Sequence, residues 1–198
     1  MFVQVIKGRT SDAAGLRRQT ERWRSDIRPG AIGFLGSTVG VATDGTFIAF
    51  ARFADEKSAA ANAERAEQHA WWEETTKYFD DEPSFRESSD VTTLFDGGAD
   101  AAGFVQVMEG TVTDRTKAEA LETPEMLAQL RSARPDLIGS LRVWFARGAF
   151  AEAAYFTTEE DARKGESSSE FSGPEHEFAE LYGDMSFIDI RDPLLTGP

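Results

Sequence analysis

The chain of 198 residues contains no cysteine. Disulfide bonds, thiolate nucleophiles, zinc–thiolate sites and cysteine-ligated iron–sulfur clusters are therefore excluded together. Four methionines carry all of the sulfur. Redox chemistry at sulfur would have only these methionines to work with.

Positive charge is also scarce, because 21 Lys and Arg stand against 35 Asp and Glu and leave a formal net charge of −14. Such a chain repels phosphate backbones and anionic lipid headgroups, so neither nucleic acid nor a membrane is an expected partner. No apolar run approaches the roughly 20 residues that span a bilayer. The first residues lack the basic and apolar segments of a secretory signal, so a cytoplasmic location is expected.

What the sequence does contain is a repeat. The segment 2–8, FVQVIKG, returns as FVQVMEG at 104–110. Further pairs follow in the same order: Arg28-Pro29 and Arg134-Pro135, Ile32-Gly33 and Ile138-Gly139, and Gly45 with Phe47 against Gly148 with Phe150. A strand that recurs at this spacing indicates two copies of one fold. With 15 Phe and 4 Trp, each half has the material for a core.

Hydrophobic periodicity predicts the order of elements in the first half. Residues 2–8 alternate as in a strand, and Leu16, Thr20, Trp23 and Ile27 follow at helical spacing. Asp44-Gly45 is a hairpin signal between two further strands. The predicted elements are strand 2–8, a helix from Ser11-Asp12 to Ile27, strands 31–42 and 46–54, helix 55–79 and strand 84–94. The order is β-α-β-β-α-β.

The second half repeats that order. Its predicted elements are strand 104–111, helical residues 113–133, strands 137–147 and 149–157, a helix interrupted by a loop at 166–173, and strand 185–190. Thr123-Pro124 is typical of a fresh helix start, so 113–133 is predicted to form two helices. The domains are expected to be residues 1–95 and 103–198, joined by a linker over 96–102.

The β-α-β-β-α-β order is the ferredoxin-like motif, whose helices cover one face of a four-stranded sheet and leave the other face bare. Two copies in one chain cover both bare faces when the sheets face each other. The predicted fold class is therefore α+β, with two tandem ferredoxin-like repeats whose antiparallel sheets form an intramolecular pseudo-dimeric α+β barrel. Two such domains that do not join are the alternative.

Each half combines the opening strand with a late helix, which carries Glu67-Gln68-His69-Ala70-Trp71-Trp72 or Glu175-His176-Glu177-Phe178. In this combination the chain resembles the dimeric α+β barrel superfamily, and more narrowly a tandem, fused two-copy member of its antibiotic biosynthesis monooxygenase-like branch. The resemblance implies a cavity between sheet and helices in each half. In relatives that cavity serves cofactor-free oxygenases of quinol-type aromatics, haem-degrading enzymes, and cyclases or isomerases.

The chain has two histidines, His69 and His176, at corresponding places in the two late helices. A histidine that faces a cavity can act as acid or base near neutral pH, or ligate iron. The resemblance implies for haem degradation a histidine here, a tryptophan on the third strand and an asparagine on the first. Phe53 and Phe156 occupy the third-strand positions, and glutamines the first, which argues against that activity. The alternative is a partly exposed histidine bonded to polar neighbours.

Gln4 and Gln106 are polar residues within otherwise apolar strands. A buried amide must find hydrogen-bond partners, so each glutamine either bonds to the surrounding protein or orients a ligand in the cavity. Trp71 and Trp72 on the late helix, with Phe53 and Phe156, either form an aromatic wall for such a ligand or fill the core.

Three functions are consistent with these residues. The first is a cofactor-independent, metal-free monooxygenase-like protein that acts on a small aromatic or polyketide-like substrate, with His69 or His176 as base and Gln4 or Gln106 as the orienting amide. The second is a noncatalytic small-molecule-binding or structural barrel. The third is a haem-binding or haem-degrading relative. The expected assembly is a monomer with pseudo-twofold symmetry or a homodimer.

Overall fold

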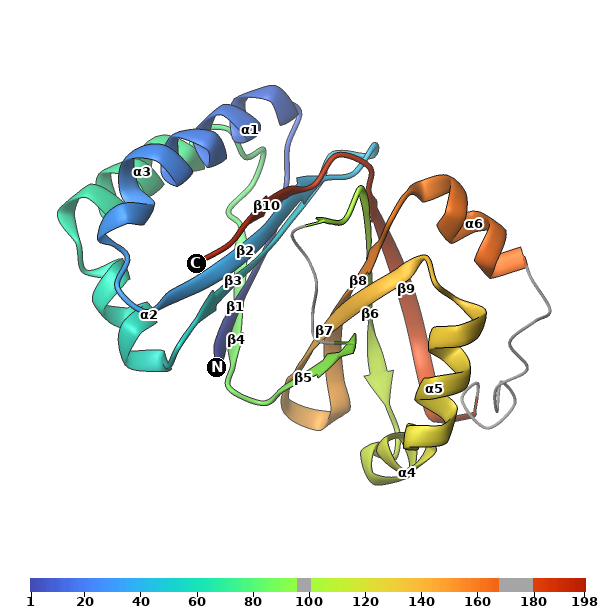
Figure 1. Ribbon diagram of the computed structural model, residues 1–198. Coiled ribbons are helices and arrows are strands. Elements are labelled where there is room, and N and C mark those ends of the chain that lie inside the picture. Colours follow the sequence, from blue (N-terminus) through green and yellow to red (C-terminus); the bar gives the residue numbers. More distant parts are fainter. Residues whose placement is uncertain (96–100, 168–179) are drawn as a thin grey trace. The chain divides into compact units, whose positions relative to one another are not determined.

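The computed structural model describes residues 1–95, 101–167 and 180–198, and the chain divides into two compact units (Figure 1). Unit 1 consists of Met1–Val91 together with Asp192–Pro198, and unit 2 consists of Thr92–Arg191. The ends of the units thus differ from those of the sequence repeats, because the last residues return to unit 1. Residues 96–100 of the expected linker lie outside the described residues.

Unit 1 contains a five-stranded antiparallel sheet in the order β10-β2-β3-β1-β4. Its elements are β1 (Phe2–Arg9), α1 (Ala13–Arg22) with a π-helical turn at Trp23–Ile27 and a 3-10 turn at Arg28–Gly30, β2 (Phe34–Val41), β3 (Thr46–Phe53), α2 (Glu56–Ala63), α3 (Ala66–Thr76), β4 (Ser84–Ser88) and β10 (Leu194–Thr196). The Asp12 side chain caps α1 by accepting a hydrogen bond from the Gly15 amide, as its position before the helix predicts.

Unit 2 repeats the arrangement in the order β5-β7-β8-β6-β9, with antiparallel β7, β8, β6 and β9. Its elements are β5 (Val91–Leu94), β6 (Phe104–Val112), α4 (Arg115–Leu121), α5 (Pro124–Ala133), β7 (Leu137–Trp144), a 3-10 turn at Ala146–Gly148, β8 (Ala149–Phe156), α6 (Glu159–Ser167) and β9 (Tyr182–Ile190). The predicted helix start is confirmed, because the Thr123 hydroxyl accepts a hydrogen bond from the Met126 amide.

Three predicted elements differ in the structure. The strand expected over 84–94 is two strands, β4 and β5, which join different sheets. The helix expected over 55–79 is broken between α2 and α3, where Arg65 is extended and its guanidinium donates to Ile27 O and Asn62 Oδ1. Strand β10 was not predicted, since three residues are too few for a periodic signal. Of the loop expected at 166–173, residues 168–173 lie outside the described residues.

Corresponding residues of the two repeats pair in the same way within their own sheets. Phe2 pairs with Phe53 in unit 1, and Phe104 pairs with Phe156 in unit 2. Each second strand has an irregularity at a glycine, Gly36 or Gly139, which faces Arg52 or Tyr155 respectively. The match of Gly33 with Gly139 in the sequence is therefore wrong, since the structural counterpart is Gly36. A side chain at Gly36, where φ is +136°, would lie 2.7 Å from Thr196 O of β10.

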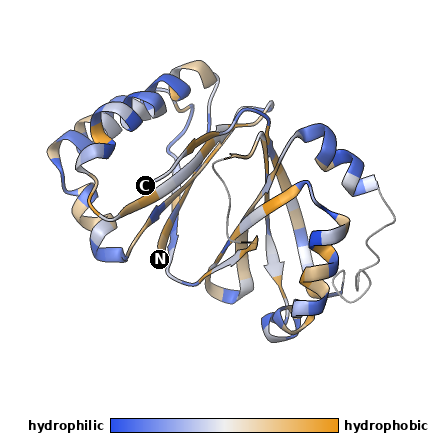
Figure 2. Cartoon of the chain, viewed as in Figure 1, coloured by the Kyte–Doolittle hydropathy of each residue, from blue (hydrophilic) through white to orange (hydrophobic). Residues whose placement is uncertain are grey.

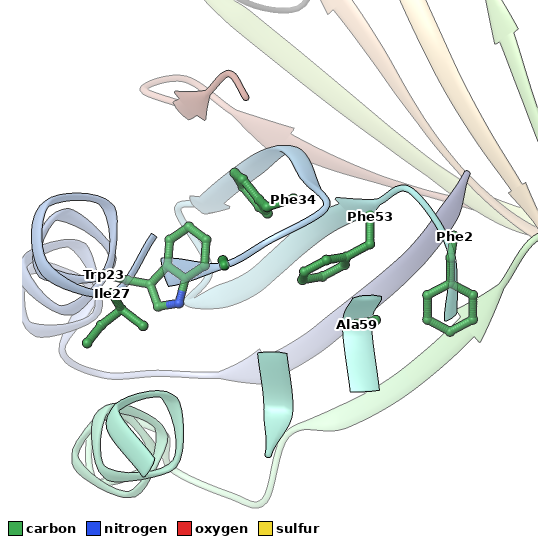
Figure 3. Packing of buried hydrophobic residues seen from close by; sticks show 7 residues of the cluster. Phe2, Trp23, Ile27, Phe34, Phe53 and Ala59 are labelled. Atoms are coloured by element: carbon green, nitrogen blue, oxygen red, sulfur yellow. The ribbon is translucent and has the colours of Figure 1, made fainter. Parts of the chain in front are cut away.

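Hydrophobic colour runs mainly along the strands of each unit, whereas the helices are largely hydrophilic (Figure 2). In unit 1, the cluster between sheet and helices is built around Trp23, Phe34 and Phe53 (Figure 3). In unit 2, two clusters centre on Phe104 with Phe156 and on Trp144 with Phe150. Helices of the described ranges are all too short or too polar to cross a bilayer.

Candidate functional site

Each unit has a cavity at the same place, between its sheet and its helices. In unit 1 this cavity measures about 90 Å³, and in unit 2 about 320 Å³. They are counterparts because Gln4, Ser37, Ala51 and Phe53 line the first, and Gln106, Ser140, Ala154 and Phe156 line the second. Ligand pockets usually begin near 300 Å³, so only the unit 2 cavity reaches that size.

The structure has two further hollows. One, of about 230 Å³, lies between α1 and strands β2 and β10, and shares Thr20, Val39 and Phe47 with the lining of the unit 1 cavity. The other, of about 470 Å³, is an open surface hollow beside α6. The unit 2 cavity is the larger of the two corresponding helix–sheet cavities and is the candidate site.

Aromatic side chains fill most of the space in unit 1. The ring centroids of Trp23 and Phe34 are 4.9 Å apart, and those of Phe34 and Phe53 are 5.7 Å apart in an edge-to-face arrangement (Figure 3). Trp23 Nε1 donates to Gln68 Oε1, and Trp71 Nε1 donates to the Gln19 carbonyl. The predicted aromatic residues Phe53, Trp71 and Trp72 line the unit 1 cavity. Their packing against one another leaves it small.

In unit 2 the corresponding space contains a buried cluster of charges. Arg142 Nε lies 2.5 Å from Glu152 Oε2, and Arg142 Nη1 lies 2.6 Å from Glu122 Oε1. The exposed fractions of these side chains are 8% for Arg142, 6% for Glu152 and 11% for Glu122. Burial lowers the pKa of Arg142, but the two carboxylates outweigh it and hold that pKa above its ordinary value. Arg142 is therefore a fixed cation.

Sheet register explains how the cluster forms. Arg142 on β7 and Glu152 on β8 are direct cross-strand partners, so both side chains stand on one face of the sheet. Glu122 reaches them from the end of α4, where it is the C-cap residue. The same register positions in unit 1 hold Val39 and Ala49. Two substitutions in the repeat thus replace an apolar pair by an ion pair.

Ser140 adds an unsatisfied group to this wall. It lies on the same face as Arg142, two residues earlier on β7, and is only 2% exposed. Its Oγ has no hydrogen-bond partner among the described residues. Tyr182 of β9 lines the same cavity, and burial raises the pKa of its phenol. Apolar residues complete the lining: Met108, Met126, Leu127, Leu130, Leu137 and Met185.

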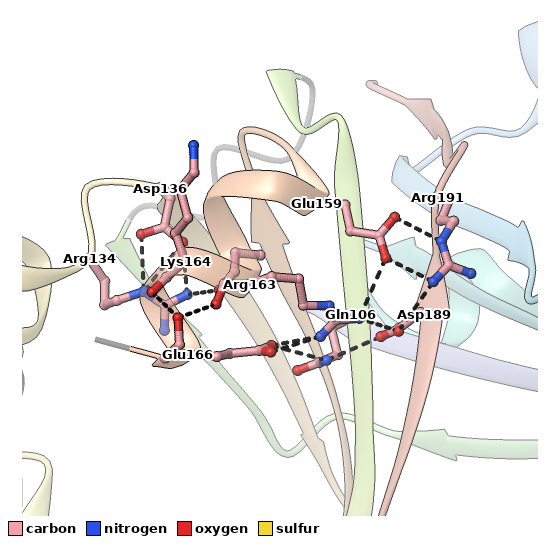
Figure 4. Close-up of polar contacts among 11 residues, drawn as sticks. Gln106, Arg134, Asp136, Glu159, Arg163, Lys164, Glu166, Asp189 and Arg191 are labelled. Atoms are coloured by element: carbon pink, nitrogen blue, oxygen red, sulfur yellow. Dashed lines mark hydrogen bonds and ion pairs between the residues drawn. The ribbon is translucent and has the colours of Figure 1, made fainter. Parts of the chain in front are cut away.

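Both predicted glutamines line their cavities and bond to the edge strand beside them. Gln4 Nε2 donates to Glu87 Oε1 at 2.6 Å, and Gln106 Nε2 donates to Asp189 Oδ1 at 3.1 Å. In unit 2, Arg163 also contacts Asp189, so the Gln106 amide belongs to a charged network with α6 (Figure 4). Both amide nitrogens therefore donate to carboxylates of the protein. This agrees with the alternative that these glutamines bond to the surrounding protein instead of orienting a ligand.

The structure places the predicted base His69 away from both cavities. Its side chain on α3 is 70% exposed, with Nε2 3.3 Å from Glu73 Oε1, and it does not line the unit 1 cavity. His176 lies outside the described residues. Within the described ranges, no three His, Asp or Glu side chains are grouped to hold a metal ion.

The charged cluster was missed because charged residues in strands are usually exposed. A signal was nevertheless present, since Arg142 is the one charged residue of Leu137–Trp144 and Glu152 the one charged residue of Ala149–Phe156. Two lone opposite charges in apolar strands of one hairpin predict a buried cross-strand pair.

No protein-family model matches the chain, and no curated protein matches it in sequence. Solved structures do match in fold. One is a candidate monooxygenase from Fusobacterium nucleatum subsp. nucleatum, with a TM-score of 0.77, 6% identity, and coverage of 99% of this chain and 94% of that chain. Another is an anthrone oxidase-like protein, with a TM-score of 0.64, 13% identity, and coverage of 98% and 92%.

A third match is a ferredoxin-fold protein from Listeria monocytogenes that is described as related to antibiotic biosynthesis monooxygenases. Its TM-score is 0.52 at 9% identity, and the alignment covers 100% of this chain and 95% of that chain. Likeness at such low identity concerns the fold. Whole-chain coverage confirms, in fold, the resemblance to two-copy antibiotic biosynthesis monooxygenase-like proteins.

Proposed function

We propose that this chain is a monooxygenase-like protein whose working site is the unit 2 cavity, and that it oxidises a small electron-rich aromatic or polyketide-like substrate without a cofactor. One observation carries the proposal: a cavity of about 320 Å³ combines an apolar lining with two buried carboxylates and a fixed cation. The fold neighbours named monooxygenases and anthrone oxidase-like support the reaction class.

In this chemistry the substrate supplies the electrons. Anthrone and O₂, for example, give anthraquinone and water, so one oxygen atom enters the product and the other leaves in water. The protein must bind the substrate, exclude water and remove a proton so that the substrate anion can reduce oxygen. A carboxylate of the cluster, Glu122 or Glu152, is the proposed proton acceptor.

Arg142 is the proposed partner of the substrate anion. When a carboxylate of the cluster accepts a proton, the remaining carboxylate and Arg142 balance each other, and the new anion lies beside a guanidinium that stays protonated. A preorganised cation in a water-poor cavity stabilises developing negative charge more strongly than solvent does. The Ser140 hydroxyl can donate to the substrate oxygen, because the described protein gives it no other partner.

Oxygen uptake with anthrone tests the proposal. Glu122→Gln and Glu152→Gln each remove a charge while keeping the shape of the side chain. We expect at least one of them to lower the rate about 100-fold, as loss of a general base does. His69→Ala is the control and should retain the parental rate, since this histidine is exposed and outside the cavity. Parental rates in both glutamine variants would contradict the assigned base.

A noncatalytic binding function is the second candidate, and the contents of unit 1 favour it. There aromatic packing leaves a counterpart cavity of only about 90 Å³, so a unit of this fold does not need a cavity of ligand size. A parent protein that takes up no oxygen with anthrone or simple quinols, yet binds them, would support this candidate over catalysis.

A further inference from the structure

Two carboxylates, Glu122 and Glu152, belong to the lining of the unit 2 cavity. Glu122 and Glu152 each contact Arg142 through one oxygen. Ionised carboxylates accept hydrogen bonds and cannot donate them. Ser140 Oγ, unpartnered within the described ranges and 2% exposed, and the Tyr182 phenol add hydroxyl groups to this wall. A ligand hydroxyl that donates to a carboxylate therefore complements this wall.

The charge of the wall points the same way. Two carboxylates surround one guanidinium, so the cluster carries one net negative charge. The other charged lining residues do not reverse this, because Arg134 is paired with Asp136 and Glu166 with Arg163. Like charges repel strongly in a poorly solvated site. An ionised aromatic carboxylate also has no hydrogen to donate to these oxygens.

We infer that the unit 2 cavity selects uncharged aromatic compounds whose hydroxyl groups donate hydrogen bonds, and that it excludes aromatic carboxylates. This selectivity rests on the proposed function and narrows its substrate class to phenols and quinols that enter protonated. The apolar body packs against Leu127, Leu130 and Met185, while the hydroxyl end meets Ser140 and the carboxylates. The ligand loses its proton only after binding.

Calorimetric titration of the full chain with 2-naphthol and 2-naphthoate at pH 7 tests the inference. The two probes share one ring system and differ in whether the polar group donates or is anionic. We expect 2-naphthoate to bind at least about tenfold more weakly than 2-naphthol, which corresponds to about 1.4 kcal/mol. Equal affinities would overturn the inference, and this comparison needs no variant.

Two variants, with one control, test whether Glu122 and Ser140 cause the preference for 2-naphthol. Glu122→Gln makes the cluster neutral while Arg142 keeps Glu152, so the gap between the two probes should narrow. Ser140→Ala should weaken 2-naphthol binding several-fold, whereas Ser37→Ala, the counterpart in unit 1, should change neither affinity. An unchanged gap in Glu122→Gln, or equal effects of the two serine variants, would overturn the inference.

The oxygen-uptake assay separates this inference from the proposed function. Oxidation of anthrone together with equal binding of both naphthalene probes would leave the function standing and overturn the selectivity. Binding of 2-naphthol in preference to 2-naphthoate, without any oxygen uptake, would support the selectivity and contradict catalysis. Failure of the parent to bind either probe would overturn the selectivity whatever the rate.

Discussion

The two units pair their strands in the same register but place side chains of opposite character at corresponding positions. At the paired positions on the second and third strands, unit 1 has Val39 and Ala49, and unit 2 has Arg142 and Glu152. Unit 1 closes its helix–sheet space with aromatic rings, while unit 2 keeps about 320 Å³ beside a buried ion cluster. After duplication, a fold that is specified twice needs only one copy with a site. The other copy can be packed for stability.

The largest expected effect comes from removing the cation of this cluster. Arg142→Val gives unit 2 the residue of unit 1 but leaves Glu122 and Glu152 buried without compensation. We expect the free energy of unfolding to fall by about 3–5 kcal/mol. Chemical denaturation followed by circular dichroism measures it.

The matched control removes the carboxylates as well. Adding Glu152→Ala and Glu122→Gln to Arg142→Val should recover much of the loss, because apolar replacement of a buried ion cluster is often nearly neutral. Exposed ion pairs contribute less than about 1 kcal/mol to the free energy of unfolding. A loss below that value in Arg142→Val alone would contradict the burial of this cluster.

A smaller effect is expected from exchanging the residues that open each strand pair. Phe34 and Leu137 occupy the same register position, opposite Phe53 and Phe156. Leu137→Phe should fill part of the unit 2 cavity and abolish 2-naphthol binding, while stability changes by less than about 1.5 kcal/mol. Phe34→Leu is the control in unit 1 and should leave binding unchanged. Retained 2-naphthol binding in Leu137→Phe would contradict this location of the site.

The smallest expected effect is on how the free energy of unfolding changes at high pH. Burial raises the pKa of Tyr182 in the folded chain, against an opposing effect of Arg142. Because the folded pKa lies above the unfolded one, this contribution to stability is complete below about pH 10 and is lost as pH rises through the folded pKa. Tyr182→Phe should show a shallower fall in unfolding free energy above pH 10. Identical slopes for variant and parent would contradict a buried phenol.

Much of the fold was predictable because the hydrophobic periodicity and the helix starts of each repeat depend on neighbouring residues. Alternation in Phe2–Arg9 and the helix start at Thr123-Pro124 are properties of neighbouring residues, and both appear as predicted. Strand β10 and the division of residues 84–94 between two sheets depend on pairing with distant segments. No short-range pattern contains that information.

The candidate site was harder to predict than the fold. The sequence pointed to His69, which is exposed, and to Gln4 and Gln106, whose amides bond to carboxylates on neighbouring strands. It did not identify Arg142 and Glu152, although each is alone in an apolar strand. A residue type indicates which chemistry is available, while its neighbours decide whether that chemistry faces a ligand.

The sequence by itself determined that the ferredoxin-like order of strands and helices occurs twice. The periodicity that identifies a strand or a helix depends only on residues that are close together in the chain. Only the tertiary structure decided which copy has the larger helix–sheet cavity. That outcome depends on how side chains from separate elements fill one shared volume: Trp23 and Phe34 meet in unit 1, whereas Glu122 reaches Arg142 in unit 2. Volume and charge balance are properties of the assembled unit.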